Sequence, residues 1–241
     1  MTQQTVGLYQ GEKVVRYYTT VKGGTAGETG GVDEEVLAYL KSILPKSMRR
    51  RIALDAGCGD CRWSEYLHRL GARRVIGLDN SPDMLALAAK RKVERDLGRL
   101  RLIRADMQEM PLLSESVDLV LASLSLMYFP ALEHMIRAIA RVLTSGGELY
   151  LATNLVTIDD SLLLKELKGK VIPIDLGTGG QTIPLENVVQ PLEQYKSAFC
   201  AGGLVLDHEK YFDPEGLSVT PGYQHKEHIV LSKAVFKLSR G

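Results

Sequence analysis

Two aspartates that each close a short apolar segment are the residues best suited to chemistry in this sequence. Asp55 ends the segment RIALD and precedes a turn containing Gly57 and Gly59, and Asp79 ends the segment VIGLD. Glycines let a backbone approach a ligand closely, and a helix start behind them exposes N–H groups with roughly +0.5 charge. The turn therefore suits a carboxylate or phosphate, whereas the Asp55 carboxylate suits an ammonium group and would repel a pyrophosphate.

This turn departs from the two common nucleotide-binding fingerprints. The dinucleotide fingerprint needs glycines in its first, third and sixth places. Counting from Gly57, the sixth residue is Arg62. The sequence also has no Walker-type lysine motif. A nicotinamide oxidoreductase is therefore the least favoured enzyme class.

The hydrophobic periodicity around the turn predicts strands that alternate with helices. Buried strands are expected at 51–55, 75–79, 100–105, 117–122 and 149–152, and two further strands, at 204–212 and 228–238, are expected to pair antiparallel at one sheet edge. Helices are expected near 36–44, 63–70, 82–89, 132–143 and 192–201. Alternation of this kind implies right-handed crossovers, an α/β fold and a mainly parallel sheet.

Five motifs in chain order resemble the class I S-adenosylmethionine-dependent methyltransferases. They are Asp55-Ala-Gly-Cys-Gly59, Gly77-Leu-Asp79-Asn-Ser-Pro-Asp-Met84, Ala105-Asp106-Met107, Asp118-Leu-Val-Leu-Ala122 and Val142-Leu-Thr-Ser-Gly-Gly147. The resemblance implies a doubly wound, mostly parallel seven-stranded sheet with helices on both faces and an antiparallel C-terminal edge strand. It also implies an enzyme with S-adenosylmethionine as cofactor and S-adenosylhomocysteine as product.

The same resemblance implies a set of cofactor-binding residues, namely Asp55, Gly57, Cys58, Gly59, Asp79, Asn80, Met84, Asp106, Met107 and Ser123. Asp55 would face the ammonium group, and Asp79 would accept both ribose hydroxyls. Asp106 would accept the adenine amino group. The structural alternatives are helix capping for the two strand-end aspartates, a simple turn for Asp106 and core packing for Met107.

The sequence departs from the family pattern at Cys61, where a third glycine is common. Cysteine is small, so the turn can survive, but we expect a stiffer or shifted loop. Cys58 and Cys61 form a Cys-x-x-Cys pattern, which also occurs in redox pairs and half zinc sites. A second cysteine pair is absent, so we expect no metal.

The methyl acceptor should be bound by less regular parts of the chain. We expect a single domain over 1–241, with an N-terminal lid segment (1–31), a cofactor-binding core (32–154), a substrate-side insertion (155–203) and C-terminal strands (204–241). The substrate-binding candidates are Tyr9, Tyr17, Tyr18, Tyr128 and the loop Gly177–Gln181. Tyr128 is also the candidate catalytic residue, and its alternative is packing beside Phe129.

Composition limits the partners. Lys and Arg total 30 against 29 Asp and Glu, and aromatic residues are 6%, which disfavours nucleic acid as a partner. Basic residues such as Lys90, Arg91 and Lys92 are interpreted as solvated charge near a helix end. The three cysteines favour the cytoplasm, and we expect no signal peptide and no membrane span.

The favoured function is methyl transfer to an O, N or C nucleophile of a small molecule by a monomer or homodimer. One alternative is a methyltransferase that acts on protein or tRNA. Another is a non-catalytic partner protein that binds S-adenosylmethionine.

Overall fold

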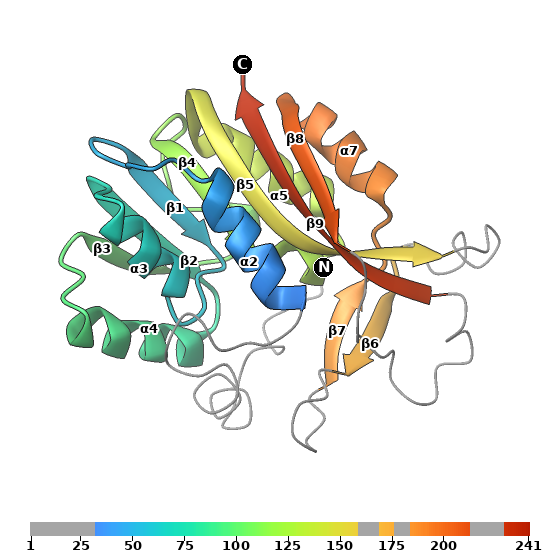
Figure 1. The fold of residues 1–241 in the computed structure, drawn as a ribbon, viewed down its shortest axis with the longest axis horizontal. Coiled ribbons are helices and arrows are strands. Elements are labelled where there is room, and N and C mark those ends of the chain that lie inside the picture. Colours follow the sequence, from blue (N-terminus) through green and yellow to red (C-terminus); the bar gives the residue numbers. More distant parts are fainter. Residues whose placement is uncertain (1–31, 159–168, 176–183, 213–228) are drawn as a thin grey trace.

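A seven-stranded sheet in the order β3-β2-β1-β4-β5-β9-β8 forms the centre of the molecule (Figure 1). The computed structural model describes residues 32–158, 169–175, 184–212 and 229–241. The sheet strands are β1 (Ile52–Ala56), β2 (Arg74–Asp79), β3 (Leu100–Arg104), β4 (Val117–Ser123), β5 (Leu143–Ile158), β8 (Leu204–Phe212) and β9 (Ile229–Arg240). The first five pair in parallel, and β9 is antiparallel to both β5 and β8. The predicted fold class is confirmed; the antiparallel strand is β9, one place in from the edge strand β8.

Helices cover both faces of this sheet, as Figure 1 shows. The helices are α2 (Val32–Ile43), α3 (Arg62–Arg69), α4 (Pro82–Glu94), α5 (Leu132–Val142) and α7 (Leu192–Ala201). One core cluster joins α2, α3 and α4 to one face of the strands, and a second joins α5 and α7 to the other. Because both faces are covered, the central part of the parallel sheet is buried, as in Leu119–Ala122 of β4.

The helix ends follow local rules that the sequence made visible. Ser81 accepts a hydrogen bond from the Met84 N–H at 3.2 Å, and Pro82 occupies the first turn of α4. Gly71, with φ +86°, follows Leu70, the C-cap of α3, in the left-handed conformation that ends many helices. The expected helix start at residue 82 is confirmed.

The strand order reverses beside β1, which lies between β2 and β4. In doubly wound sheets, ligands bind outside the carboxyl ends of the strands at this point. Leu124 follows β4 with a positive φ of 53°, and its N–H donates to the Ala152 carbonyl at 2.8 Å. The chain therefore turns sharply as it leaves β4 while it stays bonded to the neighbouring strand β5.

The structure differs from the expected elements mainly beyond the fourth strand. β5 runs from Leu143 to Ile158, much longer than 149–152, because its far half pairs with β9 as far as Ile158↔Ile229. Part of the expected insertion forms a separate hairpin of β6 (Val171–Asp175) and β7 (Pro184–Val188). Between β3 and β4 the helical element is a single 3-10 turn, η2 (Met107–Glu109).

Candidate cofactor site

The glycine loop after β1 is tied to β2 through its backbone. Gly57 has φ +74°, and the N–H groups of Gly57 and Cys58 both donate to the Leu78 carbonyl, at 2.8 and 3.0 Å. Gly59, with φ +52°, donates its N–H to Asp79 Oδ2 at 2.8 Å. The loop therefore lies over the end of β2 in a conformation that favours glycine at both positions.

Asp79 joins two loops at the carboxyl end of β2. Its Oδ1 accepts the Ser81 N–H at 2.9 Å, while Oδ2 accepts the Gly59 N–H. Burial raises the pKa of Asp79, and the backbone N–H groups of Ser81 and Gly59 oppose that rise. Each carboxylate oxygen has a second lone pair, so Asp79 can hold the loop and still accept hydroxyl groups from a ligand.

Asp55 faces helix α3. Its side chain is 2% exposed, and Oδ2 accepts the Ser64 hydroxyl at 2.7 Å. Burial raises the pKa of Asp55 to about 7, although the hydrogen bonds from Ser64 favour the charged form. Asp55 thus bonds the first turn of α3, in line with the helix-capping alternative given for this residue.

The raised pKa of Asp55 predicts how stability depends on pH. The folded protein binds the proton more tightly than the unfolded chain, in which an aspartate has a pKa of about 3.9. This group therefore stabilises the fold fully below about pH 4 and loses that contribution as pH rises to about 7. Relative to Asp55→Asn, the wild type should lose about 3 kcal/mol in urea unfolding between pH 5 and 8. Parallel stability profiles for the two proteins would contradict this expectation.

Two methionines and a serine surround the glycine loop. A Cβ added at Gly57 would lie 2.5 Å from the Ser125 Cβ and 3.5 Å from the Met107 Cε, and one at Gly59 would lie 3.2 Å from the Met84 Cε. Ser125 is buried and donates its hydroxyl to the Ala56 carbonyl at 2.8 Å. The structure therefore brings Met84 and Met107 to this loop, and it adds Ser125, which the sequence pattern did not indicate.

The remaining candidates lie on neighbouring segments. Ser123 is the last residue of β4 and pairs with Ala152 of β5. Asp106 begins η2 and accepts the Gln108 N–H at 2.8 Å, so the turn-forming alternative is also present. The Asn80 carbonyl accepts Arg104 Nε at 3.4 Å.

The substrate-side candidates are only partly described. Tyr128 lies in η3 (Leu126–Tyr128), is 8% exposed and packs in the same core cluster as Phe129. Tyr9, Tyr17, Tyr18 and the Gly177–Gln181 loop lie outside the described residues.

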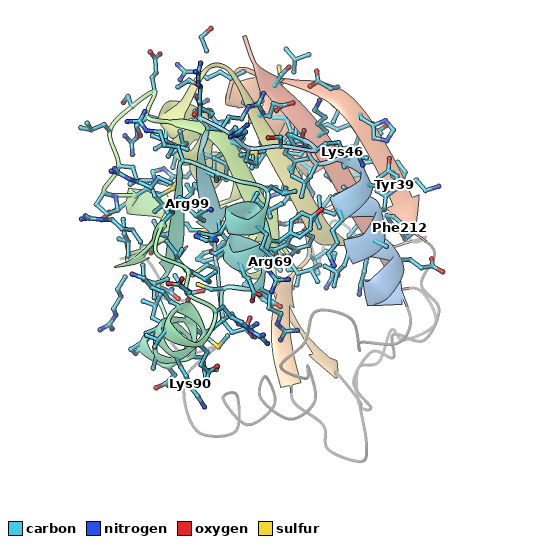
Figure 2. All side chains as sticks on the ribbon, turned by 60° about the vertical axis from the view of Figure 1, so that its left-hand side comes forward. Tyr39, Lys46, Arg69, Lys90, Arg99 and Phe212 are labelled. Atoms are coloured by element: carbon cyan, nitrogen blue, oxygen red, sulfur yellow. The ribbon has the colours of Figure 1, made fainter. Side chains whose placement is uncertain are left out.

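An ionic cluster beside the loop corrects one interpretation of the sequence. Arg91 was expected to be solvated, but its side chain is 12% exposed and donates to Asp60 at 2.9 Å and to Glu65 at 3.2 Å. Its neighbour Lys90 does project outward from α4, where it pairs with Glu94 at 3.7 Å (Figure 2). Helix α4 thus turns one of its basic residues inward, between the loop and α3.

The two loop cysteines are free thiols in the core. Cys58 is 7% exposed and Cys61 is fully buried. A hydrogen bond with the Cys61 thiol and burial both raise the pKa of Cys58, which makes its thiol a poor nucleophile. Within the described part of the chain, no group of three or more His, Cys, Asp or Glu side chains is placed to hold a metal ion.

Comparison with known proteins agrees with this geometry. The family described as "Methyltransferase domain" matches residues 54–151. An uncharacterised chloroplastic methyltransferase of Arabidopsis thaliana is 34% identical over 128 residues, covering 51% of this chain and 34% of its own length. A demethylmenaquinone methyltransferase of Oceanobacillus iheyensis is 33% identical over 98 residues, covering 40% of this chain and 41% of its own length. The chain thus spans well under half the length of these relatives.

A solved structure extends the likeness to almost the whole fold. Geranyl diphosphate methyltransferase in complex with S-adenosylmethionine superimposes with a TM-score of 0.64 at 16% identity, over 89% of this chain and 93% of that one. The fold is that of a Rossmann-like domain, with the glycine loop at the end of β1. Residues 54–151 thus match a methyltransferase domain, and solved S-adenosylmethionine-dependent methyltransferases share the fold of this chain.

Among the described residues, none forms a helix with the length and hydropathy needed to cross a bilayer.

Proposed function

We propose that this protein transfers a methyl group from S-adenosylmethionine to an O, N or C nucleophile of a small molecule. The observation that carries the proposal is the junction of Asp79 with Gly59 at the β1–β2 end. There a carboxylate and a glycine loop lie side by side at the point where the strand order reverses. This arrangement suits a ligand with vicinal hydroxyls at one end and an amino acid at the other.

The described residues fit that cofactor. Asp79 would accept the ribose hydroxyls through its remaining lone pairs, and Met84 and Met107 would pack near the adenosine. Asp55 would face the ammonium group, with its proton lost on binding. The bound cofactor supplies an electrophilic methyl group on a sulfonium centre. The protein's own contribution is alignment, because a nucleophile held about 3–3.5 Å from its target gains roughly 7–11 kcal/mol.

A small acceptor is supported by the position of charge and of the β6–β7 hairpin. The hairpin stands beyond the end of the sheet at which β1 and β4 finish (Figure 1), where it would limit the space above the cofactor. The exposed residues Arg49, Arg50 and Arg73 precede β1 and β2 and so lie at the opposite end. A nucleic acid bound there would be far from the loop. The demethylmenaquinone relative is consistent with a small acceptor.

We propose that the protein acts in the cytoplasm, because its three free cysteines suit a reducing compartment.

Calorimetric titration tests the proposal directly. The purified protein should bind S-adenosylmethionine and S-adenosylhomocysteine with Kd values on the order of micromolar, and NADH should give no heat. Methyl transfer from labelled S-adenosylmethionine to a panel of phenols, amines and carbon acids should then identify the acceptor. Binding without transfer to any small acceptor, together with transfer to a protein or tRNA fraction, would overturn the small-molecule assignment.

A further inference from the structure

The residue that replaces the family's third glycine has a strained backbone. Cys61 has φ +68° and ψ 26°, in the left-handed region, and it begins α3 without a side-chain cap. Residues other than glycine enter this region at a cost. Such a conformation persists only where the surrounding structure fixes it from several sides.

Ionic contacts lie on both sides of Cys61. Asp60, the residue before it, accepts Arg62 Nε and Arg91 Nη2, both at 2.9 Å. Glu65, in the first turn of α3, accepts Arg91 Nη1 at 3.2 Å. The Glu65 N–H also donates to the Cys61 carbonyl at 2.9 Å. The Arg91 guanidinium therefore connects Asp60, which precedes Cys61, with Glu65, whose N–H binds the Cys61 carbonyl.

This cluster is largely removed from water. The side chains of Arg91, Asp60 and Glu65 are 12%, 13% and 11% exposed. Arg91 Nε is buried and has no hydrogen-bond partner among the described residues. The guanidinium is therefore held by its bonds to the carboxylates of Asp60 and Glu65. Burying ions is costly, and such groups contribute little net stability. The better-attested effect of buried ion pairs is to favour one conformation over others. Here the conformation that they favour is that of the glycine loop.

We propose that Arg91 is a positioning residue for the cofactor site, which holds Cys61 left-handed by joining Asp60 to Glu65. The inference rests on the proposed function, since the loop matters because it binds S-adenosylmethionine. Arg91 does this from α4 without touching the ligand, and Gly59 keeps its bond to Asp79 because Cys61 cannot relax. The cluster does for this chain what a third glycine does elsewhere in the family.

The first test is the affinity of Arg91→Met for S-adenosylhomocysteine, measured by calorimetry. Without Arg91, Cys61 can leave its left-handed conformation and the glycine loop can shift, which should weaken binding about tenfold. The matched control is Arg137→Met, which breaks the exposed Arg137–Glu133 pair of 2.9 Å on α5 and should leave affinity unchanged. If Arg91→Met does not fold, Arg91→Lys serves instead, because lysine lacks the fork that reaches two carboxylates. An unchanged affinity in the variant that folds overturns the proposal.

The second test asks whether the effect passes through the backbone of Cys61. In a Cys61→Gly protein the left-handed conformation needs no external support, so adding Arg91→Met should weaken binding less than about threefold. An ordinary stabilising ion pair predicts the same loss in both backgrounds, and that result would contradict the mechanism. If the wild type fails to bind S-adenosylhomocysteine, the proposed function fails. If the wild type binds and the two losses are equal, only the role of Arg91 fails.

Discussion

Gly57→Ala should destabilise the protein by about 3 kcal/mol and weaken S-adenosylhomocysteine binding by about a hundredfold. Two effects combine at this residue. Gly57 has φ +74°, which a Cβ disfavours, and that Cβ would lie 2.5 Å from the Ser125 Cβ. Ser125 cannot move away freely, because it is buried and bonded to the Ala56 carbonyl. The loop must shift instead, and its bonds to Leu78 shift with it.

Gly146→Ala separates the two effects. Gly146 has a similar φ of +70°, but a Cβ there would meet nothing within 4 Å. This control should lose about 1 kcal/mol of stability and keep its affinity for S-adenosylhomocysteine. Urea unfolding and calorimetry on both variants give the comparison. Equal losses of stability would mean that the contact with Ser125 is relieved without cost.

Asp79→Ala should weaken S-adenosylhomocysteine binding by about a hundredfold, with a smaller effect on folding. The substitution removes the carboxylate proposed to accept the ribose hydroxyls. It also releases the Gly59 and Ser81 N–H groups that this carboxylate holds at 2.8 and 2.9 Å. Asp79→Asn should lose less, because one amide oxygen remains to accept a hydrogen bond.

The matched control for Asp79 is Asp118→Ala. Asp118 Oδ2 likewise accepts a backbone N–H, that of Ile52, at 2.8 Å. That bond lies at the start of β1, at the opposite end of the strand from the loop. Asp118→Ala should therefore lower stability and leave affinity within about twofold. A cofactor affinity that survives Asp79→Ala would contradict the assignment of the site.

The part of the site that could be predicted from the sequence consists of residues at the ends of strands. Asp55 and Asp79 each close an apolar segment, and parallel strands finish at the same edge, so their proximity needs no knowledge of helix packing. Arg91 is different, because its partner Asp60 is 31 residues away. The run Lys90-Arg91-Lys92 gives no sign of which residue turns inward. That choice depends on how α4 lies against α3.

Two other features, the turn after β4 and the length of β5, depend on backbone conformation and pairing that cannot be predicted from the residue types. Leu124 has φ +53°, a conformation leucine seldom adopts, and this turn brings Ser125 to the loop while Ser123 ends β4. The length of β5 depends on β9, which is remote in sequence. The lid role of 1–31, the 155–203 insertion and the cofactor contacts themselves stay predictions.

The place of β9 in the sheet has a consequence for folding during synthesis. β9 lies between β5 and β8 but leaves the ribosome after every other strand of the sheet. Until it arrives, β5 and β8 both have unpaired edges, and Phe236 is missing from its stack with Tyr195 and its edge contact with Phe199. Pairing of such distant segments is slow, and open strand edges invite association with other chains. The nascent protein should therefore be most prone to aggregation, and most dependent on chaperones, in the interval between the completion of β8 and the emergence of β9.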